Sequence, residues 1–323
     1  MPSIGLVLGA GGLAGHAYEA GVLSALAERT GWDPNDATII VGTSAGSGVA
    51  AYLRAGLSAS DLYRRSTGAP LSPAGAFLLA GIERPTPVPP VPNDLGRRVP
   101  RPAAPWLLAG DLARPWRLRA GRLLAAAAPA GRVPTDLIGA RVRRVHGMVW
   151  PARPTWICAL RLTDGARVVF GRDRHPPIDL GIAVQASSAI PGYFAPVLVG
   201  SHRYVDGGAH SPTNADLLVG VGLDAVIVVS PMSIERRPTS VDARTPLRLW
   251  HKAVLATEVR ALKRCGIEVR TFEPTPGDVR AIGANALDVS RMARIAEQAR
   301  RSTLDRLDRD SALAAMFTPV APR

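Results

Sequence analysis

The sequence lacks the features that would assign the chain to a secreted or membrane-spanning class. Only two cysteines, Cys158 and Cys265, occur in 323 residues, too few for the disulfide framework of a small secreted protein. The first apolar run, residues 4–8, is too short for the apolar region of a secretory signal, and no basic segment precedes it. The longest uncharged stretch, residues 180–201, is interrupted by polar residues and prolines, so no transmembrane helix is predicted. We therefore expect a cytoplasmic protein.

Aromatic residues and lysines are also scarce. Aromatic side chains make up 5% of the sequence and lie in no pattern typical of RNA recognition, so we expect no nucleic-acid partner. With only two lysines, the formal net charge of +13 comes almost entirely from arginine. Residues 84–174 hold 17 arginines against 5 aspartates, a local excess that attracts anionic surfaces. This region is a candidate for peripheral contact with an anionic membrane, although an arginine-rich composition also arises from GC-rich codon usage.

What the sequence does contain is a repeated strand–turn–helix pattern near its start. Residues 4–8 and 38–41 are apolar runs typical of buried strands. Each leads through a glycine-rich turn into a helical pattern, the first over residues 15–29 and the second ending near residue 55. Two such units in close succession predict an α/β protein with a parallel sheet.

The rest of the chain adds strands and helices around a region of different composition. Residues 84–105 are dense in proline, which blocks regular structure, and a basic stretch around Trp106 and Trp116 follows. An Asp-Gly turn at 164–165 predicts a hairpin. The predicted strands are 155–162, 167–170, 197–199, 202–205, 225–229 and 267–272, and the predicted helices are 182–188, 246–264 and 288–316. We expect a single domain over 1–323, with core motifs in 4–230, a proline- and arginine-rich insertion at about 84–150 and C-terminal helices at about 246–316.

The segment Gly42-Thr-Ser-Ala-Gly46 matches the G-x-S-x-G pattern of a nucleophile elbow. It follows a β-branched strand and precedes a helical pattern, which is the context that this motif requires. A serine on such a sharp turn lies at a helix N-terminus, whose free N–H groups stabilise developing negative charge. Ser44 is therefore the candidate nucleophile, and the alternative is a glycine-rich turn with an incidental serine.

A second glycine-rich loop, Gly9-Ala-Gly-Gly-Leu-Ala-Gly15, also lies between a strand and a helix. Its backbone N–H groups can hold a phosphate or an oxyanion. The spacing of Gly9, Gly11 and Ala14 also fits a dinucleotide-binding fingerprint, which expects an acidic residue at the end of the next strand. That strand ends at the serine turn instead, which argues against dinucleotide binding. A Walker A loop is excluded because no Gly-Lys-Ser/Thr follows.

The third candidate element is Tyr204-Val-Asp-Gly-Gly208. A carboxylate at the end of a short strand, followed by two glycines, can be presented to a site with little crowding. Taken alone, the segment is also consistent with an ordinary Asp-Gly turn. Asp206 is therefore a candidate catalytic carboxylate whose role depends on the other two motifs.

The order and spacing of the loop at 9–15, the turn at 42–46 and Asp206-Gly207-Gly208 resemble those of patatin-like phospholipases. Residues 186–196, Ala-Ser-Ser-Ala-Ile-Pro-Gly-Tyr-Phe-Ala-Pro, also look like the block that precedes the Asp-Gly-Gly of that family. The similarity covers roughly residues 4–230. It implies a three-layer α/β/α sandwich with a mainly parallel central sheet. It also implies hydrolysis of lipid acyl esters by a Ser–Asp dyad, without a catalytic histidine, a metal or another cofactor.

Carried over to this sequence, the resemblance assigns the nucleophile to Ser44 and the base to Asp206. Backbone N–H groups of Gly11, Gly12 and Ala45 would hold the oxyanion, and a lipid or other acyl ester is the expected substrate. The motif glycines are Gly9, Gly15, Gly42, Gly46, Gly207 and Gly208. The sequence departs from the family at Ala14, where many relatives carry a basic residue, and at Ala10, which replaces a glycine.

Two other functions compete with this interpretation. An α/β-hydrolase with a Ser-His-Asp triad would need a histidine base, but its serine elbow normally follows several strands. The candidates for that base are His16, His146, His175, His202, His210 and His251. A non-catalytic lipid- or membrane-binding protein could keep the same fold, but the intact Ser44 and Asp206 argue against it.

Overall fold

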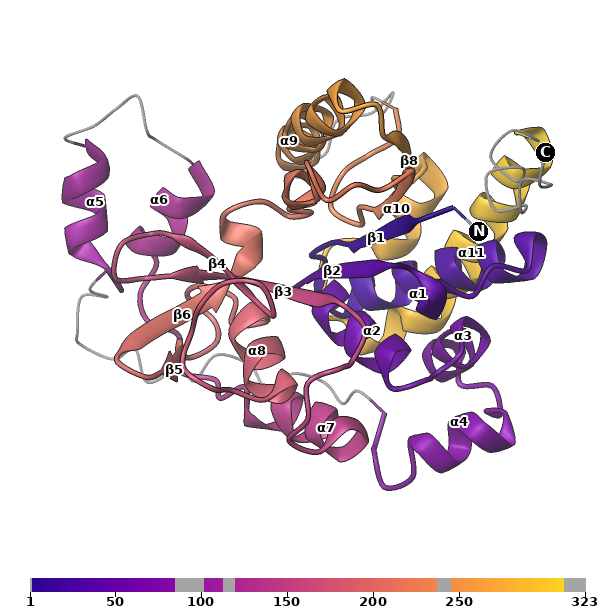
Figure 1. Cartoon of the computed structure of the whole chain (residues 1–323), viewed down its shortest axis with the longest axis horizontal. Coiled ribbons are helices and arrows are strands. Elements are labelled where there is room, and N and C mark those ends of the chain that lie inside the picture. Colours follow the sequence, from indigo (N-terminus) through magenta and orange to yellow (C-terminus); the bar gives the residue numbers. More distant parts are fainter. Residues whose placement is uncertain (1, 85–101, 113–119, 237–244, 311–323) are drawn as a thin grey trace.

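The computed structural model describes residues 2–84, 102–112, 120–236 and 245–310 (Figure 1). Within them, an eight-stranded sheet has the order β5-β6-β3-β2-β1-β7-β8, with β4 paired to β3. The neighbouring strands from β3 to β8 in this order run parallel. They are β1 (Ile4–Leu8), β2 (Ile39–Thr43), β3 (Thr155–Arg161), β7 (Ala225–Val229) and β8 (Glu268–Phe272). The sheet is therefore mainly parallel, as the sequence predicts.

Antiparallel strands complete the sheet at one edge. β4 (Arg167–Phe170) and β6 (His202–Asp206) both pair with β3, and β5 (Val197–Val199) pairs with β6. Gly165, in the turn between β3 and β4, has a φ of +69°, and the predicted hairpin is confirmed. Thr43 is opposite Cys158 in the register of β2 with β3, and Asp206 is opposite Ala159 in that of β3 with β6. This register brings the ends of β2 and β6 to the same part of the sheet.

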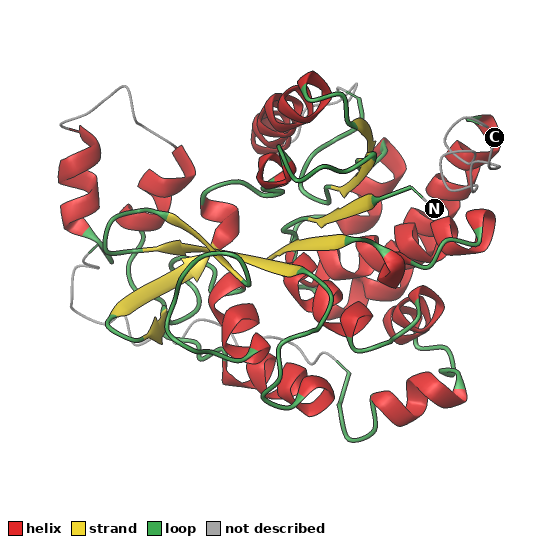
Figure 2. Cartoon of the chain, viewed as in Figure 1, coloured by secondary structure: helices red, strands yellow, loops and turns green. Residues whose placement is uncertain are grey.

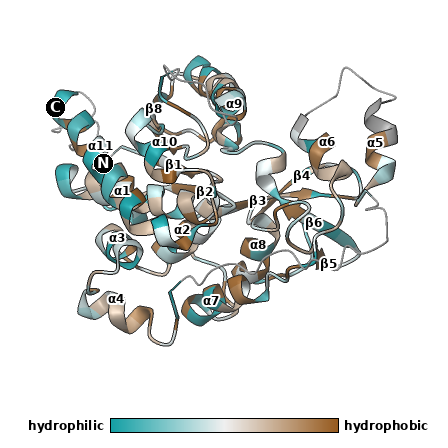
Figure 3. Ribbon diagram, turned by 180° about the vertical axis from the view of Figure 1, so that it is seen from behind, coloured by the Kyte–Doolittle hydropathy of each residue, from teal (hydrophilic) through white to brown (hydrophobic). Residues whose placement is uncertain are grey.

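Helices cover both faces of the sheet, so the described residues form three layers (Figure 1, Figure 2). Alternate residues of β1 enter different cores: Leu6 and Leu8 pack with one cluster and Val7 with the other. The first cluster includes residues of α1 (Gly12–Thr30), α2 (Ala45–Arg54), α3 (Ala59–Thr67), α8 (Leu180–Ser187) and α11 (Met292–Arg309). The second includes residues of α9 (Thr245–Arg264) and the short 3₁₀ helix η4 (Ala215–Leu218). In Figure 3, α11 carries many hydrophilic residues, as expected of an outer helix.

The expected insertion at about 84–150 contains helices where it is described. They are α5 (Pro105–Leu112), α6 (Ala120–Ala127) and α7 (Asp136–His146), while the proline-dense residues 85–101 lie outside the described residues. Two further helices are α4 (Pro73–Leu78) and α10 (Pro276–Ile282). Neither is among the helices that the sequence predicts, although α10 begins with a capping box formed by Thr275 and Asp278.

Several predicted helix boundaries are wrong by a few residues. α1 begins at Gly12 rather than near residue 15, because the glycine loop itself turns into the first helical turn. α8 ends at Ser187, before Pro191 could end it. The predicted helix at 288–316 begins as the 3₁₀ helix η5 (Val289–Arg291) and continues as α11 to Arg309, and residues 311–316 lie outside the described residues.

None of the helices that the structure describes is long and apolar enough to cross a membrane. Both cysteines are free thiols, with Cys158 buried and Cys265 exposed.

Candidate active site

Ser44 lies on the sharp turn between β2 and α2, because β2 ends at Thr43 and α2 begins at Ala45. Its φ of 53° and ψ of −116° are unusual for a residue with a side chain, and such strain costs on the order of 1–3 kcal/mol. The flanking glycines explain how the turn fits. A Cβ on Gly42 would lie 2.7 Å from the Cα of Ser47, and one on Gly46 would lie 2.2 Å from the carbonyl oxygen of Leu8. The G-x-S-x-G pattern thus reflects contacts of this turn with neighbouring backbone.

Hydrogen bonds hold the backbone of Ser44 on both sides. Its N–H donates to Oγ of Ser187 at 2.9 Å, and its carbonyl oxygen accepts from Oγ of Ser47 at 2.6 Å. Ser187 ends α8, so this helix positions the turn across the sheet edge. The side chain of Ser44 is left free to act, at a backbone position that is fixed.

The hydroxyl of Ser44 interacts with the carboxylate of Asp206, and this interaction acts to lower the pKa of that carboxyl. Asp206 ends β6, and its Oδ1 also accepts from the N–H of Gly208 at 2.7 Å. Each of the two residues is 5% exposed. Burial raises the pKa of Asp206 to about 6, although the interactions with Ser44 and Gly208 act to lower it. The structure therefore brings together the serine and the aspartate that the sequence predicts as partners.

The glycines after Asp206 are required by close approach of the chain to β3. A Cβ on Gly207 would lie 2.4 Å from the carbonyl oxygen of Cys158. One on Gly208 would lie 3.0 Å from Oδ1 of Asp206 itself and 3.2 Å from the Cβ of Ala10. The Asp-Gly-Gly segment is therefore more than an ordinary turn, since each glycine makes room for the carboxylate or its support.

The glycine loop at 9–15 lies directly against the serine turn. Gly46 donates its N–H to the carbonyl oxygen of Gly9 at 3.1 Å. The N–H groups of Gly11, Gly12 and Ala45 donate no hydrogen bond to any part of the chain that the structure describes. Gly12 and Ala45 line the same cavity as Ser44. The N–H groups of Gly12 and Ala45 are thus available to a negatively charged oxygen in this cavity, whereas Gly11 is not one of its lining residues.

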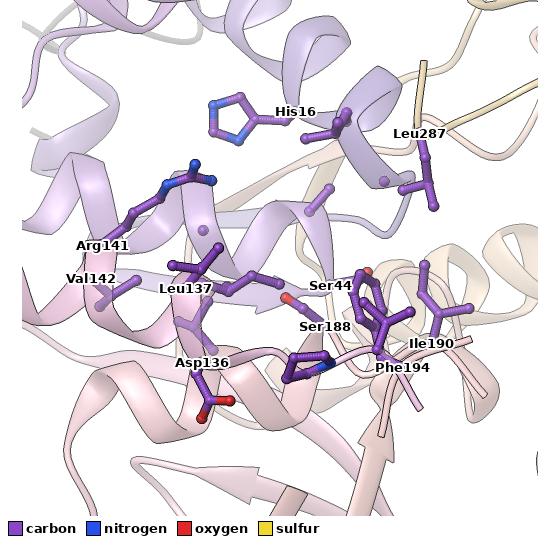
Figure 4. Close-up of a pocket in the computed structure, with 18 of the residues that line it drawn as sticks. His16, Ser44, Asp136, Leu137, Arg141, Val142, Ser188, Ile190, Phe194 and Leu287 are labelled. Atoms are coloured by element: carbon purple, nitrogen blue, oxygen red, sulfur yellow. The ribbon is translucent and has the colours of Figure 1, made fainter. Parts of the chain in front are cut away.

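Ser44 opens into a cavity of about 280 Å³ (Figure 4). Most of its wall is apolar and comes from α1, α2, α7 and the segment after α8. The apolar lining residues are Leu13, Ala45, Val133, Pro134, Leu137, Ile138, Val142, Val184, Ile190, Phe194 and Leu287. Such a wall suits a hydrocarbon chain, whose burial contributes roughly 0.8 kcal/mol per CH₂ group.

Six polar side chains of the wall are absent from the sequence prediction as site residues: His16, Tyr52, Arg65, Asp136, Arg141 and Ser188. His16 appears there only as one of six candidate bases. Burial, with a further contribution from the charge of Arg65, lowers its pKa to about 4, so the ring is neutral near pH 7. Its ring meets that of Tyr52 edge-on at 6.2 Å.

Four of the five other histidines give little support to a triad. His146 bonds the carbonyl oxygen of Ala51, His175 that of Pro176 and His251 that of Met232. His202 bonds Oγ1 of Thr163. These four rings are therefore engaged elsewhere, while Ser44 has a carboxylate partner.

A buried polar network behind the site is also missing from the sequence prediction. Glu258 of α9 accepts hydrogen bonds from Oγ of Ser211 at 2.6 Å, Oγ1 of Thr213 at 2.5 Å and the N–H of Ala215 at 3.0 Å. Asn214, with a φ of 54°, donates from Nδ2 to Oγ1 of Thr43 at 3.1 Å. The loop after Asp206 is thereby connected to the residue before Ser44.

No group of three or more histidine, cysteine, aspartate or glutamate side chains in the described ranges is placed to hold a metal ion. The reactive groups at the site are the Ser44 hydroxyl, the Asp206 carboxylate and the backbone N–H groups of the glycine loop and Ala45. Together they can perform proton abstraction, nucleophilic attack and stabilisation of an oxyanion.

Comparison with known proteins finds one family model that matches part of the chain and several similar solved structures. No curated protein sequence matches the chain. Among solved structures, VipD from Legionella pneumophila is 15% identical, over 96% of this chain and 67% of its own length, with a TM-score of 0.42. The type III effector protein ExoU is 18% identical, over 95% of this chain and 53% of its own length, with a TM-score of 0.35. The family model of patatin-like phospholipases matches residues 148–219, which include Asp206, and it confirms the resemblance that the sequence motifs predict.

Proposed function

We propose that the protein is a serine hydrolase that cleaves fatty-acyl esters of lipids, with Ser44 as nucleophile and Asp206 as general base. The observation that carries the proposal is that the Ser44 hydroxyl interacts with the buried Asp206 carboxylate at the edge of an apolar cavity. The match to patatin-like phospholipases supports a lipid as substrate.

In this mechanism, Asp206 accepts the proton of Ser44 as Oγ attacks the acyl carbonyl carbon. The carbonyl π electrons move onto oxygen, and the N–H groups of Gly11, Gly12 and Ala45 hold that oxyanion. Loss of one such donor typically costs about 3–4 kcal/mol of transition-state stabilisation. Collapse breaks the ester C–O bond, Asp206 returns the proton to the leaving alkoxide, and an acyl-Ser44 intermediate remains.

A water molecule then completes the cycle. Asp206 removes a proton from the water as its oxygen attacks the acyl carbon, and the Ser44 oxygen leaves as it takes that proton back. The fatty acid departs and the dyad returns to its starting state. The raised pKa of Asp206 favours this role, because a carboxylate with a pKa of about 6 is a stronger base than an ordinary aspartate.

The test is hydrolysis of p-nitrophenyl esters of short and medium chain length by the wild type, Ser44→Ala and Asp206→Asn. We expect both variants to lose at least about a thousandfold in kcat while remaining folded by circular dichroism. Ser188→Ala is the matched control, since Ser188 also lines the cavity and is expected to leave the rate nearly unchanged.

A second readout distinguishes a weak enzyme from a non-catalytic lipid-binding protein. A fluorophosphonate that reacts with activated serines should add one adduct to the wild type and none to Ser44→Ala, as measured by intact mass. The lipid-binding interpretation would be favoured if the wild type hydrolysed neither esters nor phospholipid vesicles and was not labelled by the fluorophosphonate.

We also propose that the arginine-rich region at 84–174 makes peripheral contact with anionic membranes. Trp106, near the start of α5, is 53% exposed, although its indole N–H donates to the carbonyl oxygens of Leu162 and Thr163; Leu124 of α6 is also exposed. Trp116 lies outside the described residues. Co-sedimentation with vesicles should increase when phosphatidylserine is included and decrease with added salt, and equal binding to neutral vesicles would contradict the proposal.

A further inference from the structure

One end of the cavity is basic. Arg65 comes from α3 and Arg141 from α7, and both line the same cavity as Ser44. In Figure 4 the guanidinium of Arg141 is directed toward His16, whereas Asp136, at the start of the same helix, turns its carboxylate away. The two arginines, called the arginine pair below, therefore lie in a wall whose other members are mostly apolar.

Arg65 is buried without a carboxylate partner. It is 7% exposed, and its guanidinium donates to the carbonyl oxygen of Glu83 at 2.8 Å. It also lies over the ring of Tyr52, 5.7 Å from the ring centre. Burial lowers the pKa of Arg65, and the nearby charge of Arg141 lowers it further. Its positive charge is thus solvated by dipoles and a ring but is not neutralised by any acid within the described ranges.

Arg141 has still fewer partners. Its side chain makes no hydrogen bond or ion pair with the residues that the structure describes. Its neighbours on α7 differ, since Arg143 pairs with Asp179 at 3.0 Å and Arg144 donates to the carbonyl oxygen of Ala80 at 3.4 Å. The contrast is informative because three arginines on one helix have the same chemistry, and only the one that lines the cavity is unpaired.

Two neighbouring guanidinium groups in an apolar cavity are unfavourable by themselves. Charges that are withdrawn from water without a counter-ion lose solvation, and like charges repel more strongly where the dielectric is low. A bound anion removes both penalties. Guanidinium groups are well suited to this, because their planar N–H donors bind phosphate oxygens in pairs.

We propose that the arginine pair binds a phosphate group, and that this group belongs to the acyl ester whose carbonyl reaches Ser44. The inference rests on the proposed function and adds a substrate class to it, namely single-chain acyl esters that carry a phosphate. The cavity of about 280 Å³ lies at the small end of ligand sites, which usually measure roughly 300–1,000 Å³, and this favours one hydrocarbon chain over two.

The test uses ligands that cannot be hydrolysed, so that binding is measured separately from catalysis. The probes are 1-O-dodecylglycerol 3-phosphate and 1-O-dodecylglycerol, which differ only in the phosphate, titrated calorimetrically into the wild type and Ser44→Ala. We expect both proteins to bind the phosphorylated ether at least about tenfold more tightly than the neutral one. If ester hydrolysis fails but this preference is found, the proposed function fails and the phosphate site stands.

Arg141→Gln should lose at least about tenfold in affinity for the phosphorylated ether and bind the neutral ether as the wild type does. Arg144→Gln is the matched control from the same helix and should change neither affinity. Arg65→Lys provides a second variant that retains the charge but not the paired donors, and it should also weaken binding of the phosphorylated ether. Equal affinities of the two ethers for the wild type, or equal losses in Arg141→Gln and Arg144→Gln, would overturn the proposal.

Inorganic phosphate distinguishes the two sources of the group. If the phosphate is part of the substrate, millimolar inorganic phosphate should compete weakly with the phosphorylated ether in the wild type. If inorganic phosphate binds the wild type but not Arg141→Gln, while the two ethers bind alike, the ligand is free phosphate and the assignment to the substrate is overturned.

Discussion

The serine turn (residues 42–46) and the arginine pair lie in the same cavity but are built in opposite ways. Around Ser44, backbone groups are fixed by hydrogen bonds from Ser47 and to Ser187, and glycines fill places where a Cβ would clash. Around Arg65 and Arg141, charges are left without an acidic partner among the described residues. The first region is complete without a ligand, whereas the second gains a counter-ion only when something binds. The rigid serine turn thus serves catalysis, and the arginine pair, which lacks a counter-ion, serves substrate recognition.

The largest effect in this comparison should come from adding one methyl group to the serine turn. Gly46→Ala places a Cβ 2.2 Å from the carbonyl oxygen of Leu8, which is backbone of an interior strand of the sheet and cannot move aside. We expect a loss of more than about 3 kcal/mol in the free energy of unfolding, or failure to fold, as measured by urea denaturation.

Gly48→Ala is the matched control two residues further along α2. A Cβ on Gly48 meets nothing within 4 Å, so this variant should be as stable as the wild type or more stable by about 0.5–1 kcal/mol. If Gly46→Ala were as stable as Gly48→Ala, the close packing of the turn would not be what requires glycine there.

Burial of Asp206 beside the serine turn has a cost in the free energy of unfolding. Burial raises its pKa from 3.8 to about 6 in the folded protein, so the folded state holds a proton that the unfolded chain has already lost between these values. Stability therefore falls as pH rises through this window, by about 3 kcal/mol in total. Asp206→Asn removes this titration. The difference in free energy of unfolding between Asp206→Asn and the wild type should therefore shift in favour of the variant by about 3 kcal/mol from pH 4 to pH 7.5.

A control of opposite sign is available on the surface. Hydrogen bonds from Ser3 lower the pKa of Asp224, so the ionised form of Asp224 stabilises the folded protein at neutral pH and this contribution is lost in acid. The free energy of unfolding of Asp224→Asn should therefore be lower than that of the wild type at pH 7, and this difference should shrink in acid. The same pH trend in both variants would show that the difference at Asp206 does not come from its burial.

The same titration should govern activity. Because Asp206 must be ionised to accept the Ser44 proton, kcat/KM should be half-maximal near pH 6 and fall about tenfold per pH unit well below it. A quenched assay of ester hydrolysis between pH 4.5 and 8 measures this profile, with Ser188→Ala expected to show the same midpoint. A midpoint near 4, the ordinary value for an aspartate, would show that burial of Asp206 does not set the pH profile.

The two regions also differ in how far the sequence predicts them. The serine turn, the glycine loop and the Asp-Gly-Gly segment are local: their backbone geometry demands particular residues at fixed spacing. The serine motif therefore singles out Ser44, and the resemblance to patatin-like phospholipases adds Asp206. Arg65 and Arg141 come from separate helices, and nothing in their local sequence distinguishes Arg141 from Arg143 or Arg144. Their proximity depends on how α3 and α7 pack, which periodicity and turn chemistry do not specify.

The smallest predicted effect concerns the network that supports the turn region from behind. In Glu258→Gln, an amide replaces a carboxylate that accepts from Ser211, Thr213 and Ala215, so one donor is left facing another donor. We expect a loss of about 1 kcal/mol in the free energy of unfolding and a decrease of a few fold in kcat, with KM nearly unchanged. The reason is that the network reaches Thr43 through Asn214 and touches the turn, not the substrate.

Thr257→Ala, an exposed neighbour on α9, is the control for this variant and should change neither kcat nor KM. A rise in KM for Glu258→Gln without a change in kcat would mean that the loop after Asp206 supports the binding wall rather than the catalytic turn. The division between a rigid catalytic region and an open recognition region would then not hold behind the cavity, because one buried carboxylate would serve both.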